Sequence, residues 1–135
     1  MLELAAEQAT SKLLQVGELA TRQRIPARYL AQMMTALRRD GLIQSIRGPK
    51  GGYKLARPAA LISVAEVIGC LDGHPTSGRG ENHQPFTNGT PEQAVVADLA
   101  AELERARLHK LEAISLGELL EQRNNRQSAQ TMYFI

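Results

Sequence analysis

Arg28 and Gln32 are the two side chains of this sequence best suited to reading the edges of nucleic-acid bases. They are four residues apart, so a helix would project both from one face. A guanidinium can donate two hydrogen bonds to guanine O6 and N7, and a carboxamide can pair with adenine. Pro26 precedes them, and Tyr29 lies between them, where it could touch a phosphate or a thymine methyl, or could instead cover the core of the turn. This spacing predicts a base-reading helix.

A second group with binding chemistry occupies residues 47–52, RGPKGG. Arg47 and Lys50 would flank the tip of a hairpin whose glycines, Gly51 and Gly52, permit positive φ and let the backbone approach a groove wall closely. A narrow minor groove attracts arginine through its enhanced negative potential, so we expect A·T-rich DNA beside such a hairpin. The alternative is a plain surface hairpin whose charges are only solvated.

Hydrophobic spacing predicts the helix that carries the first group. Over residues 26–40 the apolar side chains recur at intervals of three and four, at Leu30, Met33, Met34 and Leu37. Pro26 suits the first turn of a helix because its φ is already helical, and Gly41 can end the helix. Arg38 and Arg39 lie in the last turn, where positive charge complements the helix dipole; this is an alternative to a contact with bases.

The neighbouring segments complete a recognisable motif. A short amphipathic helix is predicted over 16–24, and a tight turn at Arg24 to Pro26 separates it from the helix over 26–40. Two short strands are predicted on either side of the glycine hairpin, so that a wing covers residues 46–54. This order predicts a winged helix-turn-helix in a mainly α fold with a small β-hairpin.

Charge is concentrated in the same region. Residues 22–57 contain nine basic side chains and one acidic side chain, Asp40, whereas the rest of the chain contains seven basic and thirteen acidic ones. The net charge of +2 therefore hides two parts of opposite sign. A polyanion is the expected partner of the basic part.

Length and composition exclude several classes of protein. A chain of 135 residues with 43% hydrophobic residues predicts one compact, mainly helical domain. Within it we expect a DNA-binding region over 1–60, and a linker helix, loop and dimerisation helix over 61–135. No apolar run is long enough to span a bilayer and no signal peptide is apparent, so we expect a cytoplasmic protein with no membrane partner. No nucleophile and base stand at a catalytic spacing, and residues 48–52 lack the Gly-Lys-Ser/Thr ending of a phosphate loop, so we expect no enzyme.

The C-terminal half predicts a dimerisation helix. Ser63 and Glu66 have the spacing of a capping box, and residues 72–90 read as a long loop. Thr90 and Pro91 open a helix that runs to about Ile114 and is too long for one side of so small a domain to cover. We therefore expect a homodimer whose interface includes Val96, Leu99, Leu103, Ala106 and Leu111, the alternative being a helix packed wholly within its own monomer.

The chain end is predicted to be less ordered. Ser115 can cap a short last helix over 116–122, and residues 122–130 are polar and expected to fray. The final four residues, 132–135, are apolar and could dock on the body or on a partner. At the other end, residues 1–8 read as the end of a helix, which leaves open whether Met1 is the natural start.

Cofactor chemistry has few candidate residues. Cys70 is the single cysteine, so it cannot form an internal disulfide or hold a zinc or iron-sulphur site alone. Its apolar neighbours suggest a small core residue, with a thiol sensor as the alternative. His74, Glu81 and His83 lie in the predicted loop and could bind a metal, although loop histidines are usually only solvated. We expect no cofactor.

Several motifs carry a resemblance to a known family. Residues 25–30 (IPARYL), 37–42 (LRRDGL) and above all 47–55 (RGPKGGYKL) resemble the bacterial winged-helix repressors that include IscR, NsrR and CymR, which are regulators of iron-sulphur clusters, nitric-oxide responses and cysteine metabolism. Residues 63–68 (SVAEVI) and 114–120 (ISLGELL) are similar to later segments of that family in the same order. The resemblance covers most of the chain apart from the loop and the tail.

The resemblance implies a homodimeric repressor on a pseudo-palindromic operator. The helix over 26–40 would enter the major groove, with Pro26, Arg28, Tyr29 and Gln32 on its reading face. The wing would reach the minor groove through Arg47, supported by Lys50 and the backbone of Gly51 and Gly52. Family members that hold a cluster have three cysteines in the loop, which here has none, so an all-cysteine cluster is excluded.

The partners expected are thus double-stranded DNA, a second copy of the chain and an effector that is either a small molecule or a regulatory protein. A second hypothesis is a winged-helix module that binds an acidic protein and has no specific DNA target. Salt dependence and sequence dependence of binding would separate the two.

Overall fold

The computed structural model describes residues 1–72 and 89–133. The N-terminal part contains three helices and an antiparallel hairpin: α1 (Leu2–Ala6), α2 (Val16–Gln23), α3 (Ala27–Arg39), β1 (Ile43–Ile46) and β2 (Gly52–Leu55). After it come a 3-10 turn and three further helices: η1 (Ala59–Leu61), α4 (Val64–Asp72), α5 (Pro91–Ala113) and α6 (Leu116–Tyr133). This order confirms a mainly α winged helix-turn-helix with a small β-hairpin and a long C-terminal helix.

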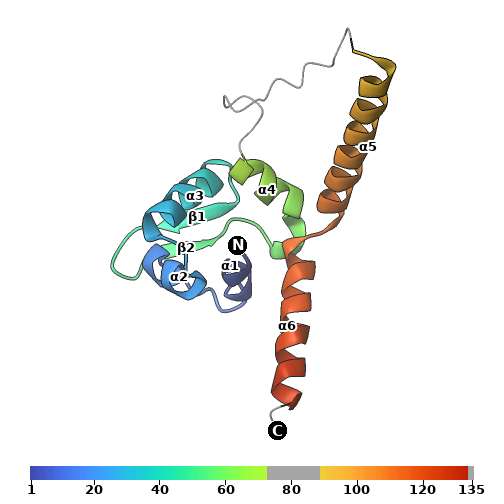
Figure 1. Ribbon diagram of the computed structural model, residues 1–135. Coiled ribbons are helices and arrows are strands. Elements are labelled where there is room, and N and C mark those ends of the chain that lie inside the picture. Colours follow the sequence, from blue (N-terminus) through green and yellow to red (C-terminus); the bar gives the residue numbers. More distant parts are fainter. Residues whose placement is uncertain (73–88, 134–135) are drawn as a thin grey trace.

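The hydrophobic core lies where α1, α2 and α3 meet the hairpin and α4. Its most deeply buried side chains are Leu14, Ile43 and Ile62. From α3 it takes the three apolar positions at helical spacing, Leu30, Met34 and Leu37, as their periodicity predicts. Figure 1 shows this compact head on one side, with α5 and α6 extending from it.

A third segment, which the sequence did not predict, pairs with the hairpin. β1 and β2 pair in antiparallel register from Ile43 opposite Leu55 to Ile46 opposite Gly52. Leu14, in the connection between α1 and α2, forms a bridge to Tyr53, with backbone N···O distances of 3.1 and 2.8 Å. The wing is therefore hydrogen-bonded to the segment that enters the helix-turn-helix.

The C-terminal helices differ from the sequence prediction in one respect. Ser63 and Glu66 form the predicted capping box of α4, and Thr90 caps α5 with Pro91 in its first turn. The last helix, however, continues to Tyr133, so the predicted end near residue 122 and the fraying of residues 122–130 were wrong. Its first turns pack on η1 and α1, and a helix anchored in this way extends at little cost through a segment without Gly or Pro.

The N-terminal end of the described chain packs on the body, whereas the C-terminal end is exposed. Residues 2–6 form a short helix that contacts α6 and β2, in keeping with the helical reading of residues 1–8. Met132 and Tyr133 are exposed at the end of α6, and residues 134–135 lie outside the described part. Across the described ranges, no helix has the length and hydropathy needed to cross a membrane.

Candidate nucleic-acid interface

The turn between α2 and α3 fixes the angle between the two helices. Arg24 adopts the left-handed conformation, with φ of 53°, at the end of α2. The next residue, Ile25, donates its backbone N–H to Ala20 O at 3.0 Å, and its side chain packs against the core. This is the hydrogen-bond pattern of a Schellman motif, which reverses the chain within one turn and starts α3 at Ala27. Pro26 is thus the N-cap of α3, and the helix begins at Ala27, one residue after the predicted start.

α3 separates its side chains into a buried face and an exposed face. Leu30, Met34 and Leu37 are buried, whereas Pro26, Arg28, Tyr29 and Gln32 are all exposed. Tyr29 is 58% exposed, so its alternative role as a cover for the core of the turn was wrong. The four predicted reading residues therefore lie together on one accessible surface, near the N-terminus of a helix whose other face is fixed in the core.

The same exposed face contains two residues that were not among the predicted reading residues. Ala31 and Thr35 are exposed on α3, and Thr35 stands three residues after Gln32 and seven after Arg28. That spacing was the signal that could have identified Thr35, because residues seven apart lie on nearly the same line along a helix. The exposed face thus extends about one turn beyond the predicted reading residues.

A glycine sets the far end of α3. Gly41 has φ of +74°, and the next residue, Leu42, donates its backbone N–H to Leu37 O at 3.0 Å. A left-handed residue at this position closes a second Schellman motif, for which glycine is the usual choice. Gly41 therefore turns the chain directly from α3 into β1, as predicted, and links the orientation of the wing to that of the helix.

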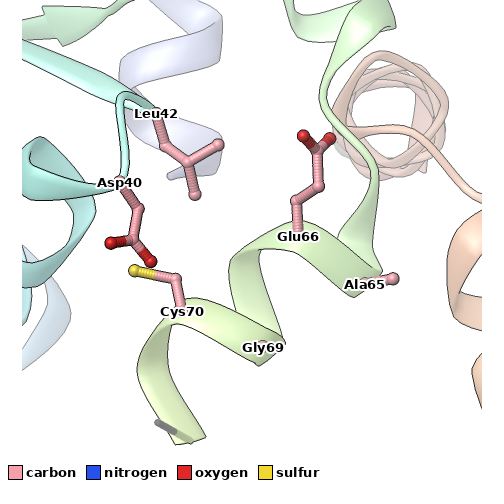
Figure 2. Close-up of a pocket in the computed structure, with 6 residues that line it drawn as sticks. All are labelled: Asp40, Leu42, Ala65, Glu66, Gly69 and Cys70. Atoms are coloured by element: carbon pink, nitrogen blue, oxygen red, sulfur yellow. The ribbon is translucent and has the colours of Figure 1, made fainter. Parts of the chain in front are cut away.

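Asp40 and Cys70 join the end of α3 to α4. Figure 2 shows the Cys70 thiol directed at the Asp40 carboxylate, and the two side chains are hydrogen-bonded. Burial and this neighbouring carboxylate raise the pKa of the Cys70 thiol to about 11. Cys70 is buried, as a core residue should be, and its protonated thiol is a poor nucleophile and a poor metal ligand. A cavity of about 460 Å³ lies beside the pair, lined also by Leu42, Ala65, Glu66 and Gly69.

The wing exposes its charges and buries one of its glycines. Arg47 and Lys50 are exposed at the tip. Gly51 is buried, and a Cβ atom on it would stand only 2.1 Å from Ile46 O. Gly52 has φ of +156°, and a Cβ there would approach Leu14 O to 2.8 Å. The two glycines thus allow the hairpin to close on its own backbone; their contact with DNA stays a prediction.

The basic region divides into paired and unpaired side chains. Arg22 pairs with Glu3 and Glu18, Arg39 pairs with Asp40 at 3.3 Å, and Arg57 pairs with Glu66 at 2.7 Å. The other six basic residues make no ion pair with any residue that the structure describes: Arg24, Arg28, Arg38, Lys54, Arg47 and Lys50. Because no carboxylate of the described residues neutralises them, these six side chains are available to phosphate groups.

Most of the predicted interface residues of the long helix are not covered by the described part of the protomer. No side chain of α5 is buried, and Val96, Leu99 and Leu103 are 67%, 54% and 62% exposed. Ala106 is also exposed and Leu111 is half-buried. The alternative in which α5 packs wholly within its own monomer is therefore wrong for the described chain. A second copy as the covering partner stays a prediction.

The three predicted metal-binding candidates follow α4 in the sequence. His74, Glu81 and His83 lie outside the described residues. Within the ranges 1–72 and 89–133, no group of three histidine, cysteine, aspartate or glutamate side chains is placed to hold a metal ion. Cys70, the one thiol in the sequence, is hydrogen-bonded to Asp40.

Comparison with known proteins places this geometry in a family context. The family model Rrf2, described as an iron-dependent transcriptional regulator, matches residues 1–122. IscR of Klebsiella pneumoniae, an HTH-type transcriptional regulator, is 32% identical over 120 residues, which cover 89% of this chain and 72% of that protein.

Solved structures give the same result for the fold. The structure titled T. potens IscR matches with a TM-score of 0.75 and 25% identity, covering 93% of this chain and 81% of that one. Staphylococcus aureus CymR matches with a TM-score of 0.69 and 30% identity, covering 89% of this chain and 88% of that one. These relatives are regulators and not enzymes, as expected from the sequence.

Proposed function

The chain belongs to the Rrf2 family of transcriptional regulators, and from this premise we propose that it acts as a homodimeric repressor on a pseudo-palindromic operator. The observation that carries this proposal is the exposed face of α3, where Gln32 projects beside Arg28, one of the six basic side chains that no described carboxylate neutralises. Such a surface combines base-reading groups with phosphate-binding groups. A DNA-binding regulator acts where the chromosome lies, which for a bacterial family is the cytoplasm.

The two elements of the interface would occupy different grooves. An α-helix fits the major groove, and the exposed N-terminal turns of α3 would present Pro26, Arg28, Tyr29 and Gln32 to base edges there. The wing would follow the adjacent minor groove, with Arg47 inserted and Lys50 on the phosphates. The bridge from Leu14 to Tyr53 supports this arrangement, because it joins the wing to the segment that enters the helix-turn-helix.

The distribution of charge along α5 supports an antiparallel dimer. Residues 91–104 contain four acidic side chains and no basic one, whereas residues 105–113 contain three basic side chains and one acidic. Two antiparallel copies would place the acidic half of each helix beside the basic half of the other, around the exposed Leu99 and Leu103. Parallel copies would set like charges against each other. Dimerisation would also supply the twofold symmetry that a palindromic operator requires.

Sensing in this chain would not use an all-cysteine iron-sulphur cluster. The family model is described as iron-dependent, but the single cysteine cannot provide the several thiolates of such a cluster. The thiol of Cys70 is buried and hydrogen-bonded to Asp40, so it does not suit metal ligation either. We propose that the regulator needs no cofactor to bind DNA, and that its signal is a small molecule or a partner protein.

A selection experiment tests the proposal. Purified protein is used to select duplexes from a random pool, and the affinity for the selected duplex is compared with that for random DNA. A specific regulator should prefer the selected duplex by about 10³-fold or more. If a dimer makes six to ten phosphate contacts, affinity should also fall by about 10³ to 10⁵ between about 50 and 200 mM salt. Equal, weak binding to all duplexes would favour the protein-interaction module and overturn the repressor.

A further inference from the structure

Four exposed polar side chains form a line along α3. Arg28, Gln32, Thr35 and Arg39 are separated by four, three and four residues, and all four are exposed. At about 3.6 residues per turn, these positions fall within about 60° of each other around the helix axis. Arg28 and Gln32 already have assigned reading roles, and Arg39 is paired with Asp40. Thr35 is the member of the line for which no role has been given.

The hydroxyl of Thr35 is used within the helix. Its Oγ1 donates to Ala31 O at 3.0 Å, one turn earlier. With the hydroxyl turned back to the backbone, the γ-methyl group is the part of the side chain left for a ligand. Ala31, also exposed, adds a second methyl group one turn away. A small apolar spot thus interrupts an otherwise polar reading line.

We propose that Thr35 reads a thymine through its γ-methyl group, as a specificity-determining residue additional to Arg28 and Gln32. The inference rests on the proposed function, in which this face of α3 enters the major groove. Thymine is the base that presents a methyl group there, and the methyl group of threonine is a suitable apolar partner for it. Thr35 lies about 10.5 Å along the helix from Arg28, which corresponds to about three base steps of 3.4 Å.

The test uses the selected operator with each thymine replaced in turn by deoxyuridine, which lacks only the methyl group. At one symmetric position, the replacement should weaken wild-type binding about fourfold for each half-site, as expected for the lost burial of one methyl group. Replacements at other thymines that α3 does not contact should have smaller effects. If no thymine in either half-site responds to the loss of its methyl group, the inference is overturned.

Two substitutions assign the effect to Thr35. Thr35→Ser keeps the hydroxyl and removes the methyl group, so it should bind the thymine operator about fourfold more weakly per half-site and should no longer distinguish thymine from deoxyuridine. Thr35→Val keeps methyl groups and removes the hydroxyl, so its fourfold discrimination should persist. The opposite pattern, with discrimination retained by serine and lost by valine, would assign reading to the hydroxyl and contradict the inference.

A matched control is available on α6. Thr131 is exposed and donates its hydroxyl to Gln127 O at 3.0 Å, as Thr35 does to Ala31 O. Thr131→Ser should therefore leave the deoxyuridine effect intact. Failure of the proposed function looks different from failure of this inference: a wild-type protein without sequence preference refutes both, whereas a specific protein indifferent to the thymine methyl refutes only the role of Thr35.

Discussion

Ser63 and Ser115 lie opposite each other in an antiparallel bridge that joins the starts of α4 and α6. Two backbone hydrogen bonds of 2.8 Å hold the bridge, from Val64 N to Ile114 O and from Leu116 N to Ile62 O. Each serine also caps its own helix. The bridge therefore determines where α5 and α6 leave the compact head, although the two serines are 52 positions apart in the sequence.

Removing the cap of α6 should weaken the whole protein. Ser115 Oγ accepts the backbone N–H of Glu118 at 3.1 Å, and Ser115→Ala should lower the free energy of unfolding by about 1 kcal/mol in urea denaturation. The control is Ser128→Ala, at an exposed position inside α6 where no hydrogen bond of the side chain to a described residue is present. It should change the free energy by less than about 0.5 kcal/mol. Equal effects of the two substitutions would show that the cap contributes nothing.

A side chain at Gly41 should lower the stability of the protein. A Cβ atom there would meet open space, so the cost of Gly41→Ala arises from its φ of +74° alone and should be about 1 kcal/mol. Gly69→Ala is the matched control, because Gly69 has helical backbone inside α4 and also faces open space. That substitution should stabilise the protein by about 0.5 to 1 kcal/mol. The two changes in the free energy of unfolding should thus have opposite signs, and the same sign would refute the conformational explanation.

Arg47 and Arg28 should affect DNA binding in different ways. Arg47→Ala should weaken binding to the operator, leave the dimer intact and reduce the salt dependence by about one phosphate contact per protomer. Arg28→Ala should also relax the preference for one base pair. A bidentate arginine contact discriminates against the wrong base by about 1 to 3 kcal/mol. Arg126→Ala, on the exposed end of α6, is the control and should change neither property. Fluorescence anisotropy titrations at several salt concentrations measure both effects, and an unaltered salt slope for Arg47→Ala would contradict a phosphate or minor-groove role.

A charge in the middle of α5 should separate the dimer. Leu103 is 62% exposed in the protomer, so Leu103→Asp should leave each protomer folded but place a carboxylate in the proposed interface. Sedimentation should then give the monomer mass, and tight operator binding should be lost because one half-site offers too small an interface. Circular dichroism supplies the control for folding. A dimer mass for this variant would place the interface elsewhere.

Cys70 should react slowly with thiol reagents. Its ordinary pKa would be 9.0, and the value of about 11 leaves a thiolate population at neutral pH about a hundredfold smaller than that of a free thiol. The rate of alkylation of the folded protein should be correspondingly low and should keep rising with pH beyond 9. The same thiol in urea should react at the ordinary rate. A fast reaction of the folded protein at pH 7 would instead support the thiol sensor.

Local sequence patterns were sufficient to predict much of the structure of the head. The period of Leu30, Met34 and Leu37 identified the buried face of α3, because helical spacing places such residues on one side whatever they pack against. The capping pair Ser63 and Glu66 and the turn at Gly41 were equally clear, since both depend on residues close in the chain. The exposure of the proposed reading residues of α3 then followed, because they lie away from the buried face.

Other features depended on partners far away in the sequence. The bridge from Leu14 to Tyr53, the facing of Ser63 and Ser115, and the hydrogen bond from Cys70 to Asp40 join segments 30 or more residues apart. No local propensity encodes such pairings. The length of α6 was misjudged for the same reason, because its polar second half looked unstable until the packing of its first turns on α1 and η1 was known.

By itself, then, the sequence determined most of the elements, their buried faces and the concentration of basic residues at α3 and the wing, because these arise from the residues themselves and their near neighbours in the chain. Only the tertiary structure decided how the wing is held to the helix-turn-helix, which basic side chains are neutralised by carboxylates and where the long helices leave the head. These are settled by contacts between distant segments, which form only when the core brings them together.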